Sequence, residues 1–541
     1  MKRSSAFFTA LFISLNVRFG YDIYLDTTEQ NALWSDNTNW KDYSTGNNPE
    51  TAPNSNTVEA DLWWNTTSVS VDGDYTLKML GANRDTGCSE AIMGEVYINM
   101  KGSKSDGSDG SLTFDLANNS NGFAIDFLTS AYLENAKNLR FIFEGGSLNF
   151  TDTVSDTVRT AVIRSSGEAG SAGQFGTEYT KTTTFNTVIN STEHLAVQGW
   201  NYAGEGPITT FNFNGDINLY DAGASEYRNF TILGNNAGGT TLVSTVNIGA
   251  SSNFVAASYK VCTNTETVID GNVELYNTSA TPMNEAFYVE KGGKATINGS
   301  LSLEATENKA MSVSGELILN GSLKSVNKGI EIYGKMTVNE NATMSLSGGD
   351  PYLLVNGGEL TLNNINKIDA ARGLRIQNAT VTFNSDALSS GTVLWMISNY
   401  SGGSGCVLNV NSNLNFNAFS WVQGNRTTIN FADGVVITLD MLSKNRDDWG
   451  NVLTDDVLLT LNNFENGAIR VTSLDERDDL SLISADGFED GSFKFVWHDE
   501  TGNYWLEATA IPEPAAMSGI LGAFALSLLA LRRRRYPSVM L

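Results

Sequence analysis

The strongest constraint on the fold is a repeat that begins near residue 287 and runs through much of the second half of the chain. Glycine-bearing turns recur after 22, 19 and 23 residues, and short alternating stretches of apolar and polar residues flank each turn. The repeated glycines are Gly293, Gly315, Gly334 and Gly357. A unit this short cannot bury an apolar face alone, so its stability requires that successive units stack on one another.

The strand that follows each turn places Ile, Leu, Val and Met on one face and Thr, Ser and Glu on the other. A slip of one residue would turn the apolar set to solvent, so only one register buries it. The residues expected to stack in one interior column are Ile297, Leu319, Val338 and Leu362. Each strand ends in asparagine, a residue that tolerates left-handed backbone geometry and can form ladders between stacked units. These asparagines are Asn298, Asn320, Asn339 and Asn363.

These demands predict an all-β fold, a right-handed parallel β-helix with a cap at each end. A leucine-rich repeat has a similar period, but its L-x-x-L-x-L-x-x-N signature and helical return are missing. The pattern of short alternating strands is less regular before residue 285, and it continues past residue 400. We expect an N-terminal cap with the first strands over 21–94, one β-helix over 95–434, and a C-terminal β cap of antiparallel strands over 435–510.

Composition limits the function classes. The chain has 541 residues, a formal net charge of −26 and only 17% charged residues, against about 25% in typical proteins. Such an acidic chain has nothing to neutralise phosphates with, so nucleic acid is excluded as a partner. An acidic, weakly charged surface suits an extracytoplasmic setting.

Histidine and cysteine offer little for chemistry. His194 and His498 are the only histidines, and neither lies in an H-x-x-x-H or H-E-x-x-H spacing. Cys88, Cys262 and Cys406 are widely spaced, and an odd count excludes a complete disulfide framework. Two interpretations of the cysteines remain open, namely buried free thiols or one disulfide bridge. We therefore predict no metal site and no cofactor.

A β-helix can carry a polysaccharide lyase or a glycoside hydrolase, and either would need acidic residues gathered in one groove. The acidic clusters here lie in turn-like contexts beside Gly, Ser or Asn. They are Asp106 with Asp109, Asp447–Asp448, Asp455–Asp456, and Asp475–Glu476 with Asp478–Asp479. We predict no catalytic residue and no enzyme. The enzyme alternative requires three or more acids to converge on one face of the solenoid.

The N-terminus carries an export pattern. Met1-Lys2-Arg3 is followed by an apolar run from Ala6 to Leu15, as in a secretory signal peptide, which we place at residues 1–20. The cleavage site is poor, because small residues in the A-x-A arrangement are missing. An uncleaved anchor or a misassigned start codon remains the alternative.

The C-terminus carries three features in order over residues 511–535. Pro512, Glu513 and Pro514 precede a stretch without charge, residues 515–531, and four arginines follow, Arg532, Arg533, Arg534 and Arg535. Seventeen helical residues span roughly 25 Å, enough for a transmembrane helix. The arginines would stay on the cytoplasmic side, leaving the body outside. The two prolines would hold the preceding segment extended and accessible.

Residues 511–535 resemble the sorting signal of PEP-CTERM proteins, a class of bacterial exported proteins. The resemblance implies recognition of the Pro-Glu-Pro motif by an exosortase, a membrane-embedded processing enzyme. It also implies a bacterium with an outer membrane and an exopolysaccharide programme, so exopolysaccharide is the second expected partner. An ordinary C-terminal membrane anchor is the alternative.

The N-terminal segment with Trp34, Trp40, Pro53 and Asp61 resembles the opening of autotransporter-passenger-like β-helix proteins. Its tryptophans are expected in the core of the cap, with a carbohydrate-stacking surface as the alternative. An autotransporter would end in a transmembrane β-barrel, whereas this chain ends in a helix and arginines, which argues against self-transport.

Together these features predict an exported, non-enzymatic structural or adhesion-type protein. It would be anchored in the membrane at first through residues 515–531 and then reside at the cell surface or in the extracellular matrix.

Overall fold

The chain forms two compact units in the computed structural model. Unit 1 comprises Met1–Leu354, Gly358–Leu360 and Asn364–Arg372, and unit 2 comprises Val355–Gly357, Thr361–Asn363 and Gly373–Leu541. The residues that the structure describes are 21–26, 32–33, 40–42, 47, 57–64, 69–71, 77–78, 93–99, 109, 111–116, 125–129, 138–152, 158–167, 180–199, 209–234, 242, 244–277, 284–306, 309–349, 351–364, 366–370, 373–397, 405–422, 427–443, 459–474, 480–511, 521–529 and 531.

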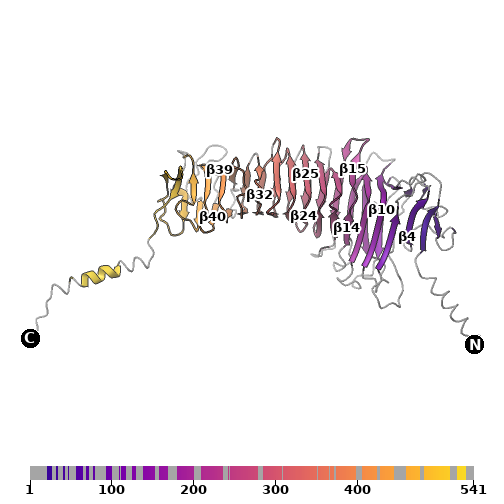
Figure 1. Ribbon diagram of the computed structural model, residues 1–541, viewed down its shortest axis with the longest axis horizontal. Coiled ribbons are helices and arrows are strands. Elements are labelled where there is room, and N and C mark those ends of the chain that lie inside the picture. Colours follow the sequence, from indigo (N-terminus) through magenta and orange to yellow (C-terminus); the bar gives the residue numbers. More distant parts are fainter. Residues whose placement is uncertain are drawn as a thin grey trace, which may run out of the picture. The chain divides into compact units, whose positions relative to one another are not determined.

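Unit 1 consists of short strands, and nearly all of them pair in parallel with a strand one repeat further along the chain (Figure 1). Three series of strands recur. The first is β4 (Thr57–Trp64), β7 (Met93–Asn99), β10 (Asn138–Thr151), β12 (Thr180–Ser191), β14 (Thr209–Phe213), β18 (Ser244–Ile248), β21 (Thr265–Ile269), β24 (Lys294–Ile297), β27 (Glu316–Leu319) and β30 (Lys335–Val338). The second is β5 (Val69–Val71), β8 (Ser111–Asp115), the later halves of β10 and β12, β15 (Ile217–Asp221), β19 (Asn253–Ala256), β22 (Asn272–Asn277), β25 (Ser300–Ala305), β28 (Ser322–Val326), β31 (Thr343–Ser347) and β34 (Asp369–Ala370).

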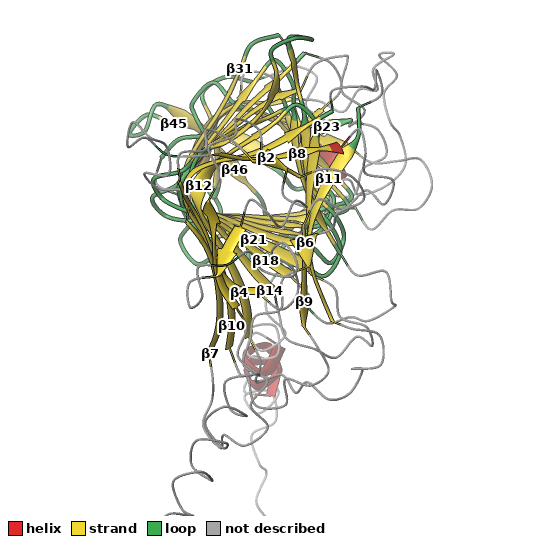
Figure 2. Cartoon of the chain, turned by 90° about the vertical axis from the view of Figure 1, so that its right-hand side faces the viewer, coloured by secondary structure: helices red, strands yellow, loops and turns green. Residues whose placement is uncertain are grey.

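The third series is β6 (Leu77–Lys78), β9 (Ile125–Thr129), β11 (Thr160–Gly167), β13 (His194–Gly199), β17 (Asn229–Leu233), β20 (Ser258–Val261), β23 (Glu285–Val289), β26 (Lys309–Val313) and β29 (Ile330–Ile332). Viewed end-on, the strands surround an interior, with β14, β18 and β21 on one side and β11 and β23 on another (Figure 2). The remaining strands of unit 1 are β1 (Tyr21–Asp26), β2 (Ala32–Leu33), β3 (Trp40–Asp42) and β16 (Glu226–Tyr227), and β32 (Leu353–Asn356) and β33 (Glu359–Leu362) have residues in both units.

The protein is thus mostly β, with long parallel sheets and a repeat, which is consistent with the predicted β-helix. An interior column follows the first series from strand to strand, and no residue in it is more than 1% exposed. Its members are Phe143, Phe185, Phe213, Ile248, Ile269, Ile297, Leu319 and Val338. The predicted stacking of Ile297, Leu319 and Val338 is confirmed, and Leu362 is also fully buried.

The corners before the first series are made by glycines that stack directly on one another. A Cβ on Gly315 would lie 2.2 Å from the carbonyl oxygen of Gly293, and one on Gly334 would lie 2.1 Å from that of Gly315. The next member of this column is Gly358, whose Cβ would lie 2.5 Å from the oxygen of Gly334. The sequence prediction of Gly357 was therefore wrong by one residue. Gly357 has a positive φ of 69° and no atom within 4 Å of its Cβ position, so it forms the turn itself.

The strand-end asparagines form the predicted ladder. Asn320 Nδ2 donates to Asn298 Oδ1 at 2.7 Å, and Asn339 Nδ2 donates to Asn320 Oδ1 at 2.5 Å. In unit 2, Asn384 Nδ2 donates to Asn363 Oδ1 at 2.7 Å. None of these asparagines has the left-handed backbone that the sequence suggested. Among the described residues, the asparagines with positive φ are Asn264, Asn327, Asn378 and Asn463.

Unit 2 also stacks strands in parallel. One series is β35 (Leu374–Gln377), β37 (Val393–Ile397), β39 (Leu414–Val422), β41 (Ile437–Ser443) and β43 (Ile469–Val471), and another is β36 (Thr380–Phe383), β38 (Cys406–Val410), β40 (Thr427–Phe431), β42 (Leu459–Asn462) and β44 (Ile483–Ala485). The named strands over 435–510 pair antiparallel only where β46 (Asn503–Glu507) meets β43 and β45 (Lys494–His498). The expectation of an antiparallel cap from residue 435 was therefore too broad, because β41 to β44 continue the parallel stack.

Both ends of the sequence fall largely outside the described residues. Residues 1–20, the predicted signal peptide, lie outside them, as does most of the sorting segment. Within the predicted span, residues 521–529 and 531 are helical. Among the residues that the structure describes, none forms a helix long and apolar enough to cross a membrane.

Truncation of one interior residue should weaken the stack strongly. Leu319→Ala should lower the free energy of unfolding by about 2–5 kcal/mol, because it leaves a cavity between Ile297 and Val338. Leu319→Asp should unfold neighbouring strands together, since it buries an unpaired charge. Chemical denaturation followed by circular dichroism measures both. Ile318→Ala, on the outer face of the same strand, is the control and should cost much less.

The glycine corners give a second test. Gly315→Ala should destabilise the protein by about 1–3 kcal/mol or more, because its Cβ would meet two backbone carbonyl oxygens of the preceding repeat at 2.2 and 2.3 Å. Gly349→Ala is the matched control, since nothing lies within 4 Å of its Cβ position. Equal denaturation midpoints for the two variants would contradict the close packing of this corner.

Candidate functional site

The residues predicted to carry sorting are not placed by the structure. Pro512, Glu513 and Pro514 lie outside the described residues, and so do Arg532, Arg533, Arg534 and Arg535. Their roles remain predictions from the sequence.

The histidines and cysteines lie apart in structural settings. His194 Nδ1 accepts a hydrogen bond from the backbone N–H of Asn229 at 3.1 Å, and burial lowers its pKa. Cys262 and Cys406 are free thiols, and burial raises the pKa of Cys262 to about 11, which makes it a poor nucleophile. Cys88 lies outside the described residues.

Of the acidic clusters singled out in the sequence, only Asp109 is described, and its Oδ2 accepts from the N–H of Gly146 at 3.1 Å. Within the described ranges, no group of three or more His, Cys, Asp or Glu side chains is arranged to hold a metal ion.

A charged cluster that the sequence did not reveal lies on the outer face of the third series in unit 1. Glu331 accepts hydrogen bonds from Lys309 Nζ at 2.5 Å, from Tyr352 OH at 2.7 Å and from Tyr333 OH. Tyr352 comes from the next repeat, and its ring covers Gly329, where a Cβ would lie 2.7 Å from ring carbons. Only 8% of the Glu331 side chain is exposed. The cluster therefore ties three successive repeats together.

Burial alone would raise the pKa of Glu331, but the hydrogen bonds from Lys309, Tyr333 and Tyr352 outweigh it and leave the pKa below its ordinary value. Burial also raises the pKa of Glu285, which lies opposite Lys309 in the strand register. Two carboxyl groups with opposite shifts are a pattern found at acid–base sites. Here both oxygens of Glu331 already accept hydrogen bonds, so the carboxylate is committed to structure.

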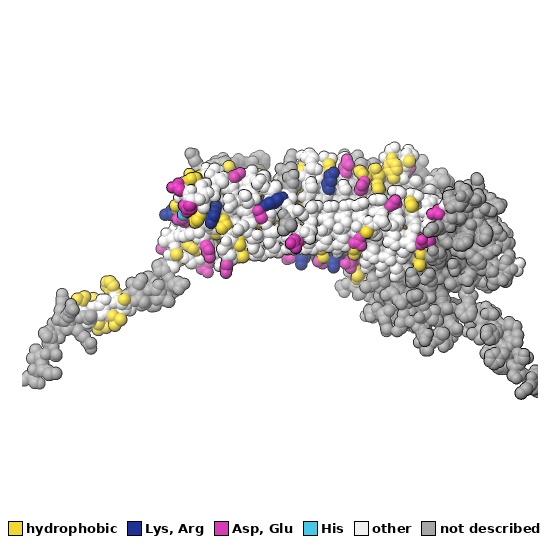
Figure 3. Space-filling model, in the orientation of Figure 1, with side chains coloured by type: hydrophobic (Ala, Val, Ile, Leu, Met, Phe, Trp, Pro, Cys, Tyr) yellow, Lys and Arg dark blue, Asp and Glu magenta, His cyan; other side chains and the backbone are white. Residues whose placement is uncertain are grey.

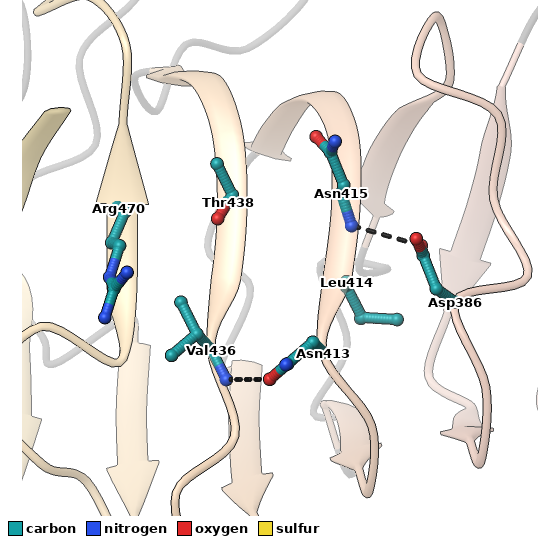
Figure 4. Close-up of a pocket in the computed structure, with 7 residues that line it drawn as sticks. All are labelled: Asp386, Asn413, Leu414, Asn415, Val436, Thr438 and Arg470. Atoms are coloured by element: carbon teal, nitrogen blue, oxygen red, sulfur yellow. Dashed lines mark hydrogen bonds between the residues drawn. The ribbon is translucent and has the colours of Figure 1, made fainter. Parts of the chain in front are cut away.

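An open groove lies on the outer face of unit 2 (Figure 4). Its volume is about 430 Å³. It is lined by Asp386, Asn413, Leu414, Asn415, Val436, Thr438 and Arg470. Asn415, Thr438 and Arg470 occupy one register position on β39, β41 and β43, so they form an outward column across three repeats.

The backbone fixes one end of the groove. Asp386 Oδ1 accepts the N–H of Asn415 at 3.1 Å, and Asn413 Oδ1 accepts the N–H of Val436 at 2.8 Å (Figure 4). The neighbouring inward column of Leu414, Ile437 and Ile469 is 2% exposed at each position and anchors the same strands in the core.

Arg470 at the other end is held by stacking. Its guanidinium carbon lies 4.2 Å from the centre of the Trp505 ring, and its Nε donates to the carbonyl of Gly467 at 3.1 Å. Trp505 lies on β46, between β43 and β45, and also stacks on His498 with 3.9 Å between ring centroids. Hydrogen bonds to Glu507 and Glu500 raise the pKa of His498. Within the described residues, Arg470 Nη1 and Nη2, the Thr438 hydroxyl and the Asn415 side chain make no hydrogen bond.

The sequence placed Trp505 in a C-terminal cap but did not connect it with Arg470. Arg470 and Trp505 are far apart in the sequence, and the pairing of β43 with β46 brings them together. The concentration of aromatic residues at Trp497, Tyr504 and Trp505 was the available signal.

Comparisons with known proteins name no relative. No family model matches the chain, and neither the curated proteins nor the solved structures include a match.

Removing the charge of Glu331 should weaken unit 1 in a pH-dependent way. Glu331→Gln should lower the free energy of unfolding by about 1.5–3 kcal/mol near pH 7, because charge-assisted hydrogen bonds are lost and Lys309 keeps its charge. A carboxyl whose folded pKa is depressed stabilises the fold above its unfolded pKa and loses that contribution as pH falls through the folded pKa. The difference between wild type and variant should therefore shrink below about pH 4. Denaturation at several pH values measures it.

The control is Glu304→Gln on β25, because Glu304 is exposed. Its effect should stay within about 0.5 kcal/mol at every pH. A Glu331→Gln effect that does not change with pH would contradict the depressed pKa.

Proposed function

We propose that this chain is an exported, non-enzymatic structural or adhesion-type protein of the cell surface or extracellular matrix. In this proposal the body is a right-handed parallel β-helix closed by N- and C-terminal caps. The observation that carries the proposal is the order of three features at the C-terminus. A Pro-Glu-Pro motif, an uncharged segment at 515–531 and four arginines follow one another directly.

The proposed route begins with a secretory signal at residues 1–20. The segment 515–531 then holds the chain in the membrane as a transmembrane helix, with Arg532 to Arg535 on the cytoplasmic side. An exosortase recognises Pro512, Glu513 and Pro514 just outside the membrane and releases the body to the surface. Exopolysaccharide is the proposed partner there.

The body supports a scaffolding role. On the face drawn in Figure 3, much of the described surface is neither charged nor apolar. Many uncharged polar side chains are engaged in bonds between repeats, such as Asn218 to Asn190 at 3.2 Å and Asn247 to Asn212 at 2.8 Å. A surface used to hold the stack together suits a durable, passive protein.

A polysaccharide lyase or glycoside hydrolase on the same scaffold is the alternative. One feature that bears on this alternative is the pair Glu285 and Glu331 beside Lys309. The hydrogen bonds that occupy both Glu331 oxygens favour the structural interpretation.

Deleting residues 512–535 should leave the protein released or misplaced, because recognition and anchoring would both be lost. Fractionation of cells into soluble, membrane and surface pools, with detection of the body, measures this. Replacing Pro512 and Pro514 with Ala should reproduce the sorting defect while keeping the membrane segment.

Pro537→Ala is the matched control, since this proline lies in the same tail beyond the arginines. It should leave placement unchanged. Unaltered fractionation of the deletion variant would overturn the sorting proposal.

A further inference from the structure

We infer that the groove of unit 2 is a binding site for an uncharged, hydroxyl-rich saccharide segment, held by Arg470, Thr438 and Asn415. This inference rests on the proposed function, because it locates on the body the site for the polysaccharide partner. The groove volume of about 430 Å³ lies within the range of small-ligand sites, and the groove is open enough to admit part of a longer chain.

The polar groups in the groove match hydroxyl groups. A hydroxyl both donates and accepts, so it pairs equally well with an amide, a hydroxyl, a guanidinium or a carboxylate. The groove presents an amide, a hydroxyl and a guanidinium at Asn415, Thr438 and Arg470. The column spans three repeats, so these groups lie in a row along the stacking direction. Such a row fits successive hydroxyls of an extended saccharide better than a single small ion.

Charge favours an uncharged ligand. The chain carries a net charge of −26, and among the described residues that line the groove Arg470 is the only basic one, with the carboxylate of Asp386 at the other end. A polyanion would meet repulsion from the net negative charge of the molecule, and a polycation would meet the positive charge of Arg470 at one end of the site. A hydroxyl-rich chain without charge avoids both penalties.

Arg470 is pre-organised for binding. Trp505 stacks on its guanidinium, and the Gly467 carbonyl holds its Nε, so the Nη groups are fixed while remaining free to donate. Because little side-chain freedom remains to be lost, a hydrogen bond made by this fork costs less entropy than one made by a flexible lysine. Gly467 makes this arrangement possible, since a Cβ there would lie 2.6 Å from the Trp505 ring.

The test is isothermal titration calorimetry of the purified full-length chain in detergent. The probes are uncharged hexasaccharides of glucan, mannan, galactan and xylan type, with polygalacturonate as the anionic comparison. We expect at least one uncharged probe to bind, with an affinity that does not change between low and high salt, because no ion pair forms. Arg470→Ala should weaken binding about ten- to a hundredfold, and Thr438→Val should weaken it severalfold.

Arg375→Gln is the control, since Arg375 lies on β35 of the same sheet but outside the groove. It should bind as the wild type does. Circular dichroism and thermal midpoints verify that each variant is folded. If Arg470→Ala does not fold, Thr438→Val still tests the inference.

The inference is overturned if no uncharged probe binds, if only polygalacturonate binds and does so in a salt-dependent way, or if folded Arg470→Ala and Thr438→Val retain full affinity. These outcomes leave the sorting proposal untouched, because binding is measured on purified protein. A sorting failure in cells would likewise leave the groove result standing.

Discussion

The stacking of the most regular repeats depends on one backbone hydrogen bond that recurs at the glycine corners before β27, β30 and β33. The carbonyl of a corner glycine accepts the N–H of the residue after the corresponding glycine in the next repeat, as from Glu316 to Gly293 at 3.0 Å and from Lys335 to Gly315 at 2.8 Å. This bond brings the two backbones so close that no side chain fits between them. It also fixes the register there, so β27 meets β24, and β30 meets β27, residue for residue.

Fixed register determines what both faces of a strand can do. Inward, it produces columns that change from phenylalanine to aliphatic side chains without a gap, and Phe143, Phe185 and Phe213 stack with 5.1 and 4.9 Å between ring centroids. On the outward face, the register places side chains of the same kind above one another. Amides can hydrogen-bond in such a column, whereas like charges repel one another. The charged positions of the first series alternate in sign, and Lys294 Nζ lies 3.6 Å from Glu266 Oε1. Low charge content is therefore a consequence of stacking.

The proposed binding groove depends on the same register. Arg470 contacts Trp505 because β46 pairs antiparallel with β43, the last strand of its series. This pairing places the tryptophan beside the outward column of Asn415, Thr438 and Arg470. The Glu331 cluster depends on register differently, since Lys309, Tyr333 and Tyr352 come from the repeat before, the same repeat and the repeat after that of Glu331. In the groove, the Nη groups of Arg470 remain free to donate hydrogen bonds. In the Glu331 cluster, Lys309, Tyr333 and Tyr352 all donate to the carboxylate.

The repeat, the alternation of faces and the stacked interior can all be predicted from the amino-acid sequence, because a glycine turn followed by a two-residue alternation leaves one register that buries the apolar set. It also contains the ordered motifs near the two ends on which the export proposal rests. Whether Gly357 or Gly358 occupies the crowded corner could be seen only once the repeats were stacked, since adjacent glycines differ only in their neighbours. The contacts of Arg470 with Trp505 and of Lys309 with Glu331 are likewise seen only in the folded structure, because they follow from loop lengths that a local sequence pattern does not encode.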